Sequence, residues 1–277
     1  MKILSIVGAR PNFMKIKPIY EEFKKRRIEQ ILIHTGQHYD ENMNRVFFED
    51  LELPKPDVFL GIGSGTHGVQ TGTMMSRIEE VLSQEKPDLT IVVGDVNSTL
   101  AGAISSIKMQ IPVAHVESGY RSFDMRMPEE INRILVDRIS QFLFAPTEDA
   151  VNNLISEGAD KKRIFFVGNV MIETLLSHLQ KSKISKILDD MSLEKDNYGV
   201  LTIHRAENTS GPQKLIEIFN VLKNVESKII VPLHPRTRKV LCDIGYLDKL
   251  GKNIDIIEPL GYLDFLALMS NSKFVMT

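Results

Sequence analysis

The sequence predicts an α/β protein with two doubly wound, Rossmann-like domains, the second of them truncated. Short β-branched runs alternate with amphipathic stretches of about ten to fifteen residues, which is the pattern of a parallel sheet covered by helices. A Lys- and Ser-rich helical stretch over 169–195 interrupts this rhythm, and a second α/β run follows it. Because 277 residues suffice for two cores, we expect an N-terminal domain over 1–168 and a partial C-terminal domain over 169–277.

The first half is expected to alternate regularly. Strands are predicted at 3–7, 31–34, 89–93, 113–116, 142–145 and 164–167. Helices are predicted at 12–27, 40–50, 66–84, 98–109, 128–140 and from 147 onward. Thr66 suits a helix N-cap and Pro128 suits the first turn of a helix. Pro54 and Pro56 break the chain ahead of a Gly-rich turn at 61–65.

The second half repeats the pattern on a smaller scale. Strands are predicted at 199–203, 228–232, 254–257 and 273–276, and helices at 212–223, 236–250 and 263–270. The chain ends directly after the last of these strands, where a parallel sheet would place a further ligand-bearing loop.

Charge and cysteine usage narrow the class of protein. A formal net charge of -2 argues against nucleic acid or a membrane surface as the main partner, so local groups have to hold any anionic ligand. The single cysteine, Cys242, excludes an internal disulfide and a cysteine-based zinc cage. No signal peptide and no stretch of ~20 apolar residues is evident. We expect a cytoplasmic protein that needs no metal and no other cofactor.

The stretch that follows the predicted strand at 113–116 carries the strongest signal for chemistry. Glu117 comes directly after the strand, and Glu129 and Arg133 lie four apart on one face of the next helix. Arg121 adds a second guanidinium. Open α/β sheets bind ligands at the carboxyl ends of their strands, so these groups suit proton transfer on an anionic substrate.

Other strand ends of the first half are also polar. Asp95 ends the neighbouring predicted strand, where it either caps the next helix or works with Glu117. Arg10 and Lys15 follow the first strand and could form an anion pocket with the helix amides. Gln37 and His38 follow the second strand and could line the same site.

The second half contributes basic loops after its strands. His204, Arg205 and Glu207 follow one strand, and His234 and Arg236 follow the next. Each loop on its own is compatible with a solvated surface. Together they suggest a nucleotide-sugar enzyme, in which cations bind a diphosphate and acids act on the sugar.

Eight ordered segments resemble the non-hydrolysing UDP-N-acetylglucosamine 2-epimerases along the entire chain. They are GARPNFMK, HTGQHYDENM, GDVNSTLAG, HVESGYRSFDMRMPEEINR, FAPTEDA, GNVMIETLL, TIHRAEN and PLGYLDFLALMSNSKFVMT. The resemblance implies a fold like that of the glycosyltransferase B class, with a nucleotide-binding second domain and the site between the domains. It implies reversible inversion at C2 of UDP-GlcNAc to give UDP-ManNAc, by elimination of UDP and its re-addition. It also implies a homodimer.

The resemblance also assigns roles. The family's active-site residues match Arg10, Lys15, Asp95, Glu117, Glu129, Arg133 and His204. We expect Glu117 and Asp95 to exchange the C2 proton, with Glu129 and Arg133 ordering them. His204, with the N-terminal cations, would stabilise the leaving phosphates.

The sequence departs from the family in two places. An Asp-Ser-Gly-Gly…Glu-Glu segment that holds the nucleotide in the family is not among the 277 residues, so we expect weak or absent turnover from them alone. Gln37 matches the regulatory site of some bacterial members, but Asp40 and the region 73–74 do not match it, so allosteric activation is not expected.

Alternative functions remain open on the sequence. A UDP-2,3-diacetamido-glucuronate 2-epimerase shares HYDENM, MPEEINR and HRAEN, and would carry an extra cation for the sugar carboxylate. A hydrolysing epimerase would release free ManNAc, and a retaining glycosyltransferase would need an acceptor cleft. A non-catalytic UDP-sugar-binding fragment is the alternative from outside enzymes.

Overall fold

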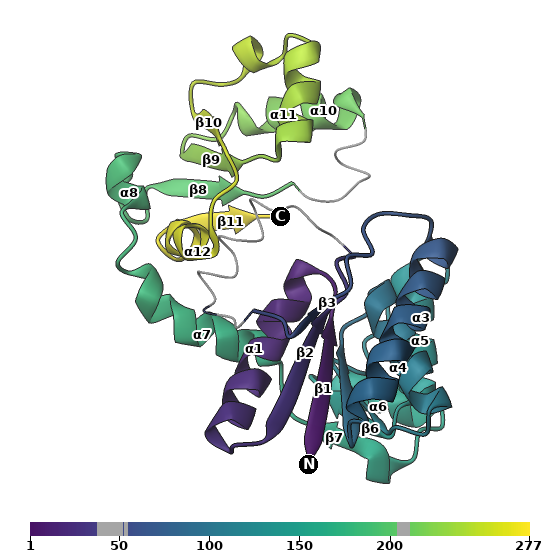
Figure 1. The fold of residues 1–277 in the computed structure, drawn as a ribbon. Helices are drawn as coiled ribbons and strands as arrows, with labels where there is room; N and C mark the ends of the chain where they lie inside the picture. Colours follow the sequence, from purple (N-terminus) through teal and green to yellow (C-terminus); the bar gives the residue numbers. More distant parts are fainter. Residues whose placement is uncertain (38–51, 53–54, 204–210) are drawn as a thin grey trace. The chain divides into compact units, whose positions relative to one another are not determined.

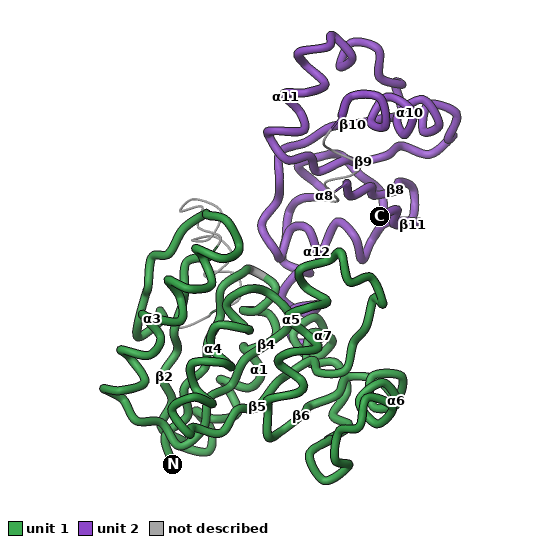
Figure 2. Tube along the Cα trace, turned by 90° about the vertical axis from the view of Figure 1, so that its right-hand side faces the viewer, with its two compact units in different colours: residues 1–176 green, residues 177–277 purple. Residues whose placement is uncertain are grey.

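The computed structural model describes residues 1–37, 52, 55–203 and 211–277 (Figure 1). The chain divides into two compact units, Met1–Leu176 and Ser177–Thr277, coloured green and purple in Figure 2. The sequence places the domain boundary after residue 168, ahead of helix α7 (Val170–Ser182), whereas the division into units falls inside that helix. Each unit is described by itself below.

In the described part of unit 1, seven strands form one sheet in the order β3-β2-β1-β4-β5-β6-β7. The strands are β1 (Lys2–Val7), β2 (Glu29–His34), β3 (Val58–Phe59), β4 (Leu89–Val93), β5 (Val113–Val116), β6 (Phe142–Ala145) and β7 (Ile164–Phe166). Every pairing is parallel. The order reverses between β1 and β4, and such a switch point is where doubly wound sheets bind ligands.

Helices cover both faces of this sheet, as Figure 1 shows for α1 on one face and for α3, α4 and α5 on the other. Their bounds are α1 (Arg10–Lys25), α3 (His67–Glu85), α4 (Asn97–Lys108), α5 (Pro128–Ile139) and α6 (Glu148–Ser156), with a 3-10 turn at Lys161–Arg163. The strand β4 is apolar except for Thr90, because both of its faces are covered. Leu4, Ile6 and Val92 pack with Met74 and Ile78 in one core cluster.

Unit 2 repeats the architecture with a smaller sheet. Its described residues form four parallel strands in the order β10-β9-β8-β11. They are β8 (Tyr198–Leu201), β9 (Lys228–Pro232), β10 (Ile254–Ile257) and β11 (Phe274–Met276). The helices are α8 (Ile187–Asp190), α10 (Pro212–Leu222), α11 (Pro235–Asp243) and α12 (Tyr262–Ser270), with a 3-10 turn at Leu247–Lys249. Leu215, Phe219 and Leu241 are fully buried beside the sheet.

The fold class predicted from the alternation is confirmed, and the differences are local. The helix predicted over 236–250 ends at Asp243, because Gly245 adopts a left-handed conformation (φ +61°) that no helix continues through. The helical stretch predicted over 169–195 is two helices, α7 and α8. The short strand β3 was not predicted, and the helix predicted at 40–50 lies outside the described residues.

Within the described ranges, none of the helices has both the length and the hydropathy that crossing a bilayer requires.

Candidate active site

The candidate site lies in unit 1, where the carboxyl ends of β1, β4 and β5 meet. Asn12 links the first two of these ends, since its Oδ1 accepts from the amides of Gly8 and Ala9 and its Nδ2 donates to the Val93 carbonyl (3.1 Å). Asn12 is buried at the start of α1. The loop after β1 is therefore fastened to the end of β4 at the switch point.

Lys15 and Glu117 form an ion pair beside this loop, although they are far apart in the sequence. Their side chains are only 9% and 14% exposed, so little water screens the pair. The backbone of Glu117 is left-handed (φ 73°), and its amide donates to the Phe144 carbonyl (3.1 Å). A non-glycine residue held in this conformation stores strain, which proteins concentrate at functional sites.

Gly94 comes directly before Asp95 and lies against the Lys15–Glu117 ion pair. Its φ is +70°, and a Cβ added there would lie 2.8 Å from Lys15 Nζ and 3.5 Å from Glu117 Oε2. The ion pair thus packs directly on the Gly94 backbone, and Asp95 is the next residue. Because β4 and β5 pair directly, the expectation that Asp95 and Glu117 follow neighbouring strands of one sheet is confirmed.

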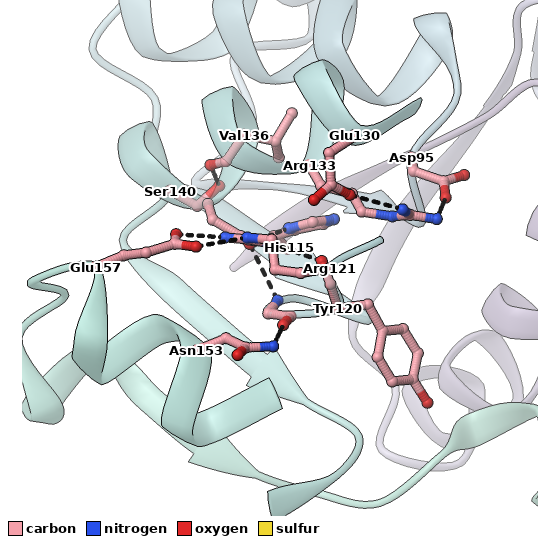
Figure 3. Close-up of polar contacts among 12 residues, drawn as sticks. Asp95, His115, Tyr120, Arg121, Glu130, Arg133, Val136, Ser140, Asn153 and Glu157 are labelled. Atoms are coloured by element: carbon pink, nitrogen blue, oxygen red, sulfur yellow. Dashed lines mark hydrogen bonds and ion pairs between the residues drawn. The ribbon is translucent and has the colours of Figure 1, made fainter. Parts of the chain in front are cut away.

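Arg133 holds the second carboxylate. From the middle of α5 its guanidinium pairs with Asp95 through Nη2 and with Glu130 through Nη1 (3.0 Å), as Figure 3 shows. Asn132 donates from its Nδ2 to the Asp95 carbonyl (2.8 Å). Asp95 is therefore anchored to α5 at its side chain and at its backbone.

Glu130 is a buried anion that orders the loop ahead of α5. Burial by itself raises a carboxyl pKa, but hydrogen bonds from the amides of Ser122 and Phe123 and from Arg133 hold the pKa of Glu130 below its usual range. Glu130 is 1% exposed, so it supports the site from behind. The sequence argument placed Glu129 and Arg133 on one face of this helix, and the structure pairs Arg133 with Glu130.

Glu129 faces a separate hollow next to the site. A pocket of about 220 Å³ is lined by Glu129 and Asn132 from α5, by Gln37 after β2 and by Gln70 from α3. Gln37 accepts from Ser98 (2.7 Å) and is buried. The structure thus places Glu129 and Gln37 at one pocket, beside the Asp95–Arg133 pair.

Arg121 does not reach this cluster. Its side chain is 1% exposed and pairs with Asp137 (2.8 Å) and, through two nitrogens, with Glu157 (2.6 and 2.7 Å). Figure 3 shows the guanidinium directed towards Glu157, away from Asp95. This geometry gives no support to the expectation that Arg121 contacts a ligand, because its guanidinium group already forms ion pairs with two carboxylates of the protein.

Several predicted residues cannot be placed at the site. His38, His204, Arg205 and Glu207 lie outside the described residues, and the side chain of Arg10 is likewise not described. In unit 2, His234 is the N-cap of α11, with its Nδ1 accepting from the Arg236 amide (3.2 Å). His234 and Arg236 are exposed there.

Sequence reasoning missed Asn12, Gly94, Glu130 and Asn132, which build the site, and Asp137, which pairs with Arg121. For Asp137 a signal was present, because Glu130, Arg133 and Asp137 recur at helical spacing on one face of α5. For Asn12 and Gly94 no local signal existed, since their partners come from other strands.

In the described ranges, no group of three His, Cys, Asp or Glu residues is placed to hold a metal ion.

The fold and the site together place two carboxyl groups and their paired cations at the switch point of a doubly wound α/β sheet, an arrangement typical of enzymes. The family described as UDP-N-acetylglucosamine 2-epimerase matches residues 21–277. A UDP-N-acetylglucosamine 2-epimerase homolog of Methanococcus maripaludis is 50% identical over all of this chain and 78% of its own length. The chain belongs to the UDP-N-acetylglucosamine 2-epimerase family.

Two further comparisons bear on the substrate. The crystal structure of Methanocaldococcus jannaschii UDP-GlcNAc 2-epimerase in complex with UDP-GlcNAc and UDP has a TM-score of 0.89 and 47% identity, over 99% of this chain and 78% of that one. The Pseudomonas aeruginosa UDP-2,3-diacetamido-2,3-dideoxy-D-glucuronate 2-epimerase is 44% identical, over all of this chain and 78% of its own length.

Proposed function

We propose that this protein interconverts UDP-GlcNAc and UDP-ManNAc by inverting C2 of the sugar. One observation carries the proposal: Asp95 and Glu117, each paired with a cation, flank the Gly94 turn at the switch point. Paired and mostly buried carboxylates at this place suit the removal and return of a carbon-bound proton. Family membership and the UDP-GlcNAc complex of the archaeal relative support the choice of substrate.

The reaction would proceed in two reversible halves. A carboxylate takes the C2 proton, the C–H electrons form the C1–C2 double bond, and the C1–oxygen bond breaks so that its electrons leave with UDP. The 2-acetamidoglucal then receives a proton on the opposite face of C2 while an oxygen of the UDP diphosphate attacks C1. Inversion needs a proton acceptor on one face of C2 and a proton donor on the other. We assign these two parts to Glu117 and Asp95, one as carboxylate and the other as carboxylic acid, because they follow neighbouring strands.

The cations of the site have two tasks in this scheme. Lys15 and Arg133 hold the carboxyl groups of Glu117 and Asp95 in place through their ion pairs. The departing diphosphate also needs positive charge, which we assign to Lys15 together with Arg10 and His204. Glu129 is assigned a supporting part, ordering the proton-transferring groups from the start of α5.

A second substrate is favoured by one observation. The 44% identical Pseudomonas relative is named for UDP-2,3-diacetamido-2,3-dideoxy-D-glucuronate, so this sugar is the alternative substrate. A carboxylate on the sugar would require a further cation at the hexose, and among the described side chains of the site the cations are Lys15 and Arg133, both already paired. The neutral N-acetyl sugar is therefore the better match.

Proton NMR of the product tests the proposal. UDP-GlcNAc is incubated with the protein for hours and the approach to equilibrium is followed. Appearance of the anomeric signal of UDP-ManNAc, with UDP still attached, supports the proposal. Free ManNAc would indicate a hydrolysing enzyme, conversion of only the diacetamido-glucuronate would indicate the second substrate, and binding without conversion would indicate a non-catalytic protein.

Matched variants connect the activity to the site. Glu117→Gln removes one carboxylate of the site, and Glu80→Gln makes the same chemical change on the exposed surface of α3. We expect product from Glu80→Gln and from the unchanged protein, and none from Glu117→Gln. Equal product from both variants would refute the assignment of Glu117.

We further propose that the protein works in the cytoplasm, where its single cysteine stays reduced, and as a homodimer. Analytical ultracentrifugation across a range of concentrations tests the dimer, and a single monomeric species at all concentrations would refute it.

A further inference from the structure

His115 is a buried polar residue that the proposed reaction does not use. It lies on β5 with no exposed surface, and both of its ring nitrogens have oxygen partners. Nδ1 lies 2.6 Å from Asp137 Oδ1, and Nε2 lies 2.8 Å from the Gly94 carbonyl oxygen. A carbonyl oxygen can only accept, so Nε2 is the donor in the bond to Gly94.

Asp137 is held firmly on the other side of the ring. Its Oδ2 accepts from the Gly119 amide (3.0 Å) and from Arg121 (2.8 Å), while Oδ1 faces His115. Burial by itself raises a carboxyl pKa, but His115, Arg121 and the Gly119 amide hold the pKa of Asp137 below its usual range. Arg121 in turn pairs with Glu157, so the carboxylate that braces the ring is itself fixed by a buried ion-pair network.

The acceptor of Nε2 is the peptide unit that leads into Asp95. The Gly94 amide donates to the Val116 carbonyl (3.0 Å), and the Gly94 carbonyl accepts from His115, so β5 holds this turn from both sides. The same turn carries the Lys15–Glu117 ion pair on its surface. A rotation of the Gly94 carbonyl would therefore move both acidic groups relative to each other.

We propose that His115 is a positioning residue: its ring, braced by Asp137, holds the Gly94 carbonyl and thereby sets the distance between the Asp95 and Glu117 carboxylates across which the C2 proton is exchanged. The inference rests on the proposed function, because it concerns the geometry of that reaction. Asp137 orients the ring through its contact with Nδ1, and both Asp137 and Arg133 come from α5.

Two substitutions test the two hydrogen bonds of the His115 ring one at a time. The amide nitrogen of Gln lies as many bonds from Cα as Nε2 of His, and the amide nitrogen of Asn lies as many bonds as Nδ1. His115→Gln can therefore still donate to the Gly94 carbonyl but not to Asp137, whereas His115→Asn can donate to Asp137 but not to Gly94. Each variant loses one buried hydrogen bond, so each is the structural control of the other.

The rate of deuterium incorporation at C2 of UDP-GlcNAc in D₂O is measured against substrate concentration for both variants. We expect His115→Asn to lower kcat about 10- to 100-fold with KM within about 3-fold, because a misplaced reacting group costs rate rather than binding. We expect His115→Gln to stay within about 5-fold of the unchanged protein. Equal losses of kcat in both variants, in proportion to their losses in melting temperature, would show a merely structural role and overturn the proposal.

A measurement on the unchanged protein stands even if a variant fails to fold. In ¹⁵N-histidine-labelled protein, Nε2 of His115 should carry a proton, with the signal assigned by its disappearance in His115→Gln. An unprotonated Nε2 would overturn the proposal. If Nε2 is protonated but no deuterium enters the sugar in the unchanged protein, the proposed function fails, whereas the hydrogen bond from His115 to Gly94 stands.

Discussion

Gly94→Ala is the substitution with the clearest local consequence. The residue has φ +70°, and a left-handed conformation costs a residue with a Cβ roughly 1–2 kcal/mol. The new methyl would also lie 2.8 Å from Lys15 Nζ and 3.5 Å from Glu117 Oε2, so the ammonium has to move away. Overpacking of this kind adds about 1–3 kcal/mol. The free energy of unfolding of unit 1 should therefore fall by about 2–5 kcal/mol.

Gly158→Ala is the matched control. Its φ is +82°, but no atom lies within 4 Å of the added Cβ, so it carries the backbone strain without the contact. We expect thermal unfolding to show the strain of roughly 1–2 kcal/mol alone in this variant, with C2 deuteration within about 2-fold of the unchanged protein. In Gly94→Ala the displaced ion pair should lower the deuteration rate about 100-fold or more. Similar deuteration rates in the two variants would refute the argument that the space over the Gly94 backbone determines the position of the Lys15–Glu117 ion pair.

Three further outcomes follow from particular contacts. Lys15→Met leaves the Glu117 charge unpaired in a mostly buried site, so urea titrations should show a loss of about 3 kcal/mol in the free energy of unfolding. Adding Glu117→Gln to this variant should recover most of that loss. Additive losses in the double variant would contradict this. Burial lowers the pKa of His34 to about 4, so as the pH falls the unfolded chain binds this proton before the folded protein does. The free energy of unfolding should therefore fall by on the order of 3 kcal/mol from this group between about pH 6.5 and pH 4. An equal dependence of stability on pH in His34→Asn would contradict this. In unit 2, Gly199→Ala should lower the free energy of unfolding by about 1–3 kcal/mol, because the added methyl meets the Phe274 ring on the paired strand. Adding Phe274→Val should relieve this loss. An unchanged melting temperature in Gly199→Ala would contradict the argument.

Much of the fold follows from local patterns. The buried strands are nearly continuous runs of apolar residues, and prolines and glycines mark the ends of several helices, so element order was predictable. The helix over 236–250 was overextended because Gly245 looked like an interior residue of an amphipathic stretch. Gly245 is instead the left-handed residue that follows the C-cap of α11, Ile244.

The candidate site was predictable only in part, for a topological reason. Asp95 and Glu117 stand at the ends of consecutive strands, and consecutive parallel strands usually neighbour each other, so their proximity could be predicted. Lys15 reaches Glu117 because β1 lies next to β4, and strand order is not written in any local pattern. The burial of Arg121 likewise depends on Glu157 and Asp137 arriving from two helices.

Deuterium at C2 tests the central claim most directly. The protein is incubated with UDP-GlcNAc in D₂O, and the recovered UDP-GlcNAc and UDP-ManNAc are examined by mass spectrometry and proton NMR. If carboxylates at the switch point remove and return the C2 proton, both sugars acquire deuterium at C2, and Glu117→Gln stops the incorporation. Conversion to UDP-ManNAc with the original C2 hydrogen retained, or undiminished incorporation in Glu117→Gln, would contradict the account.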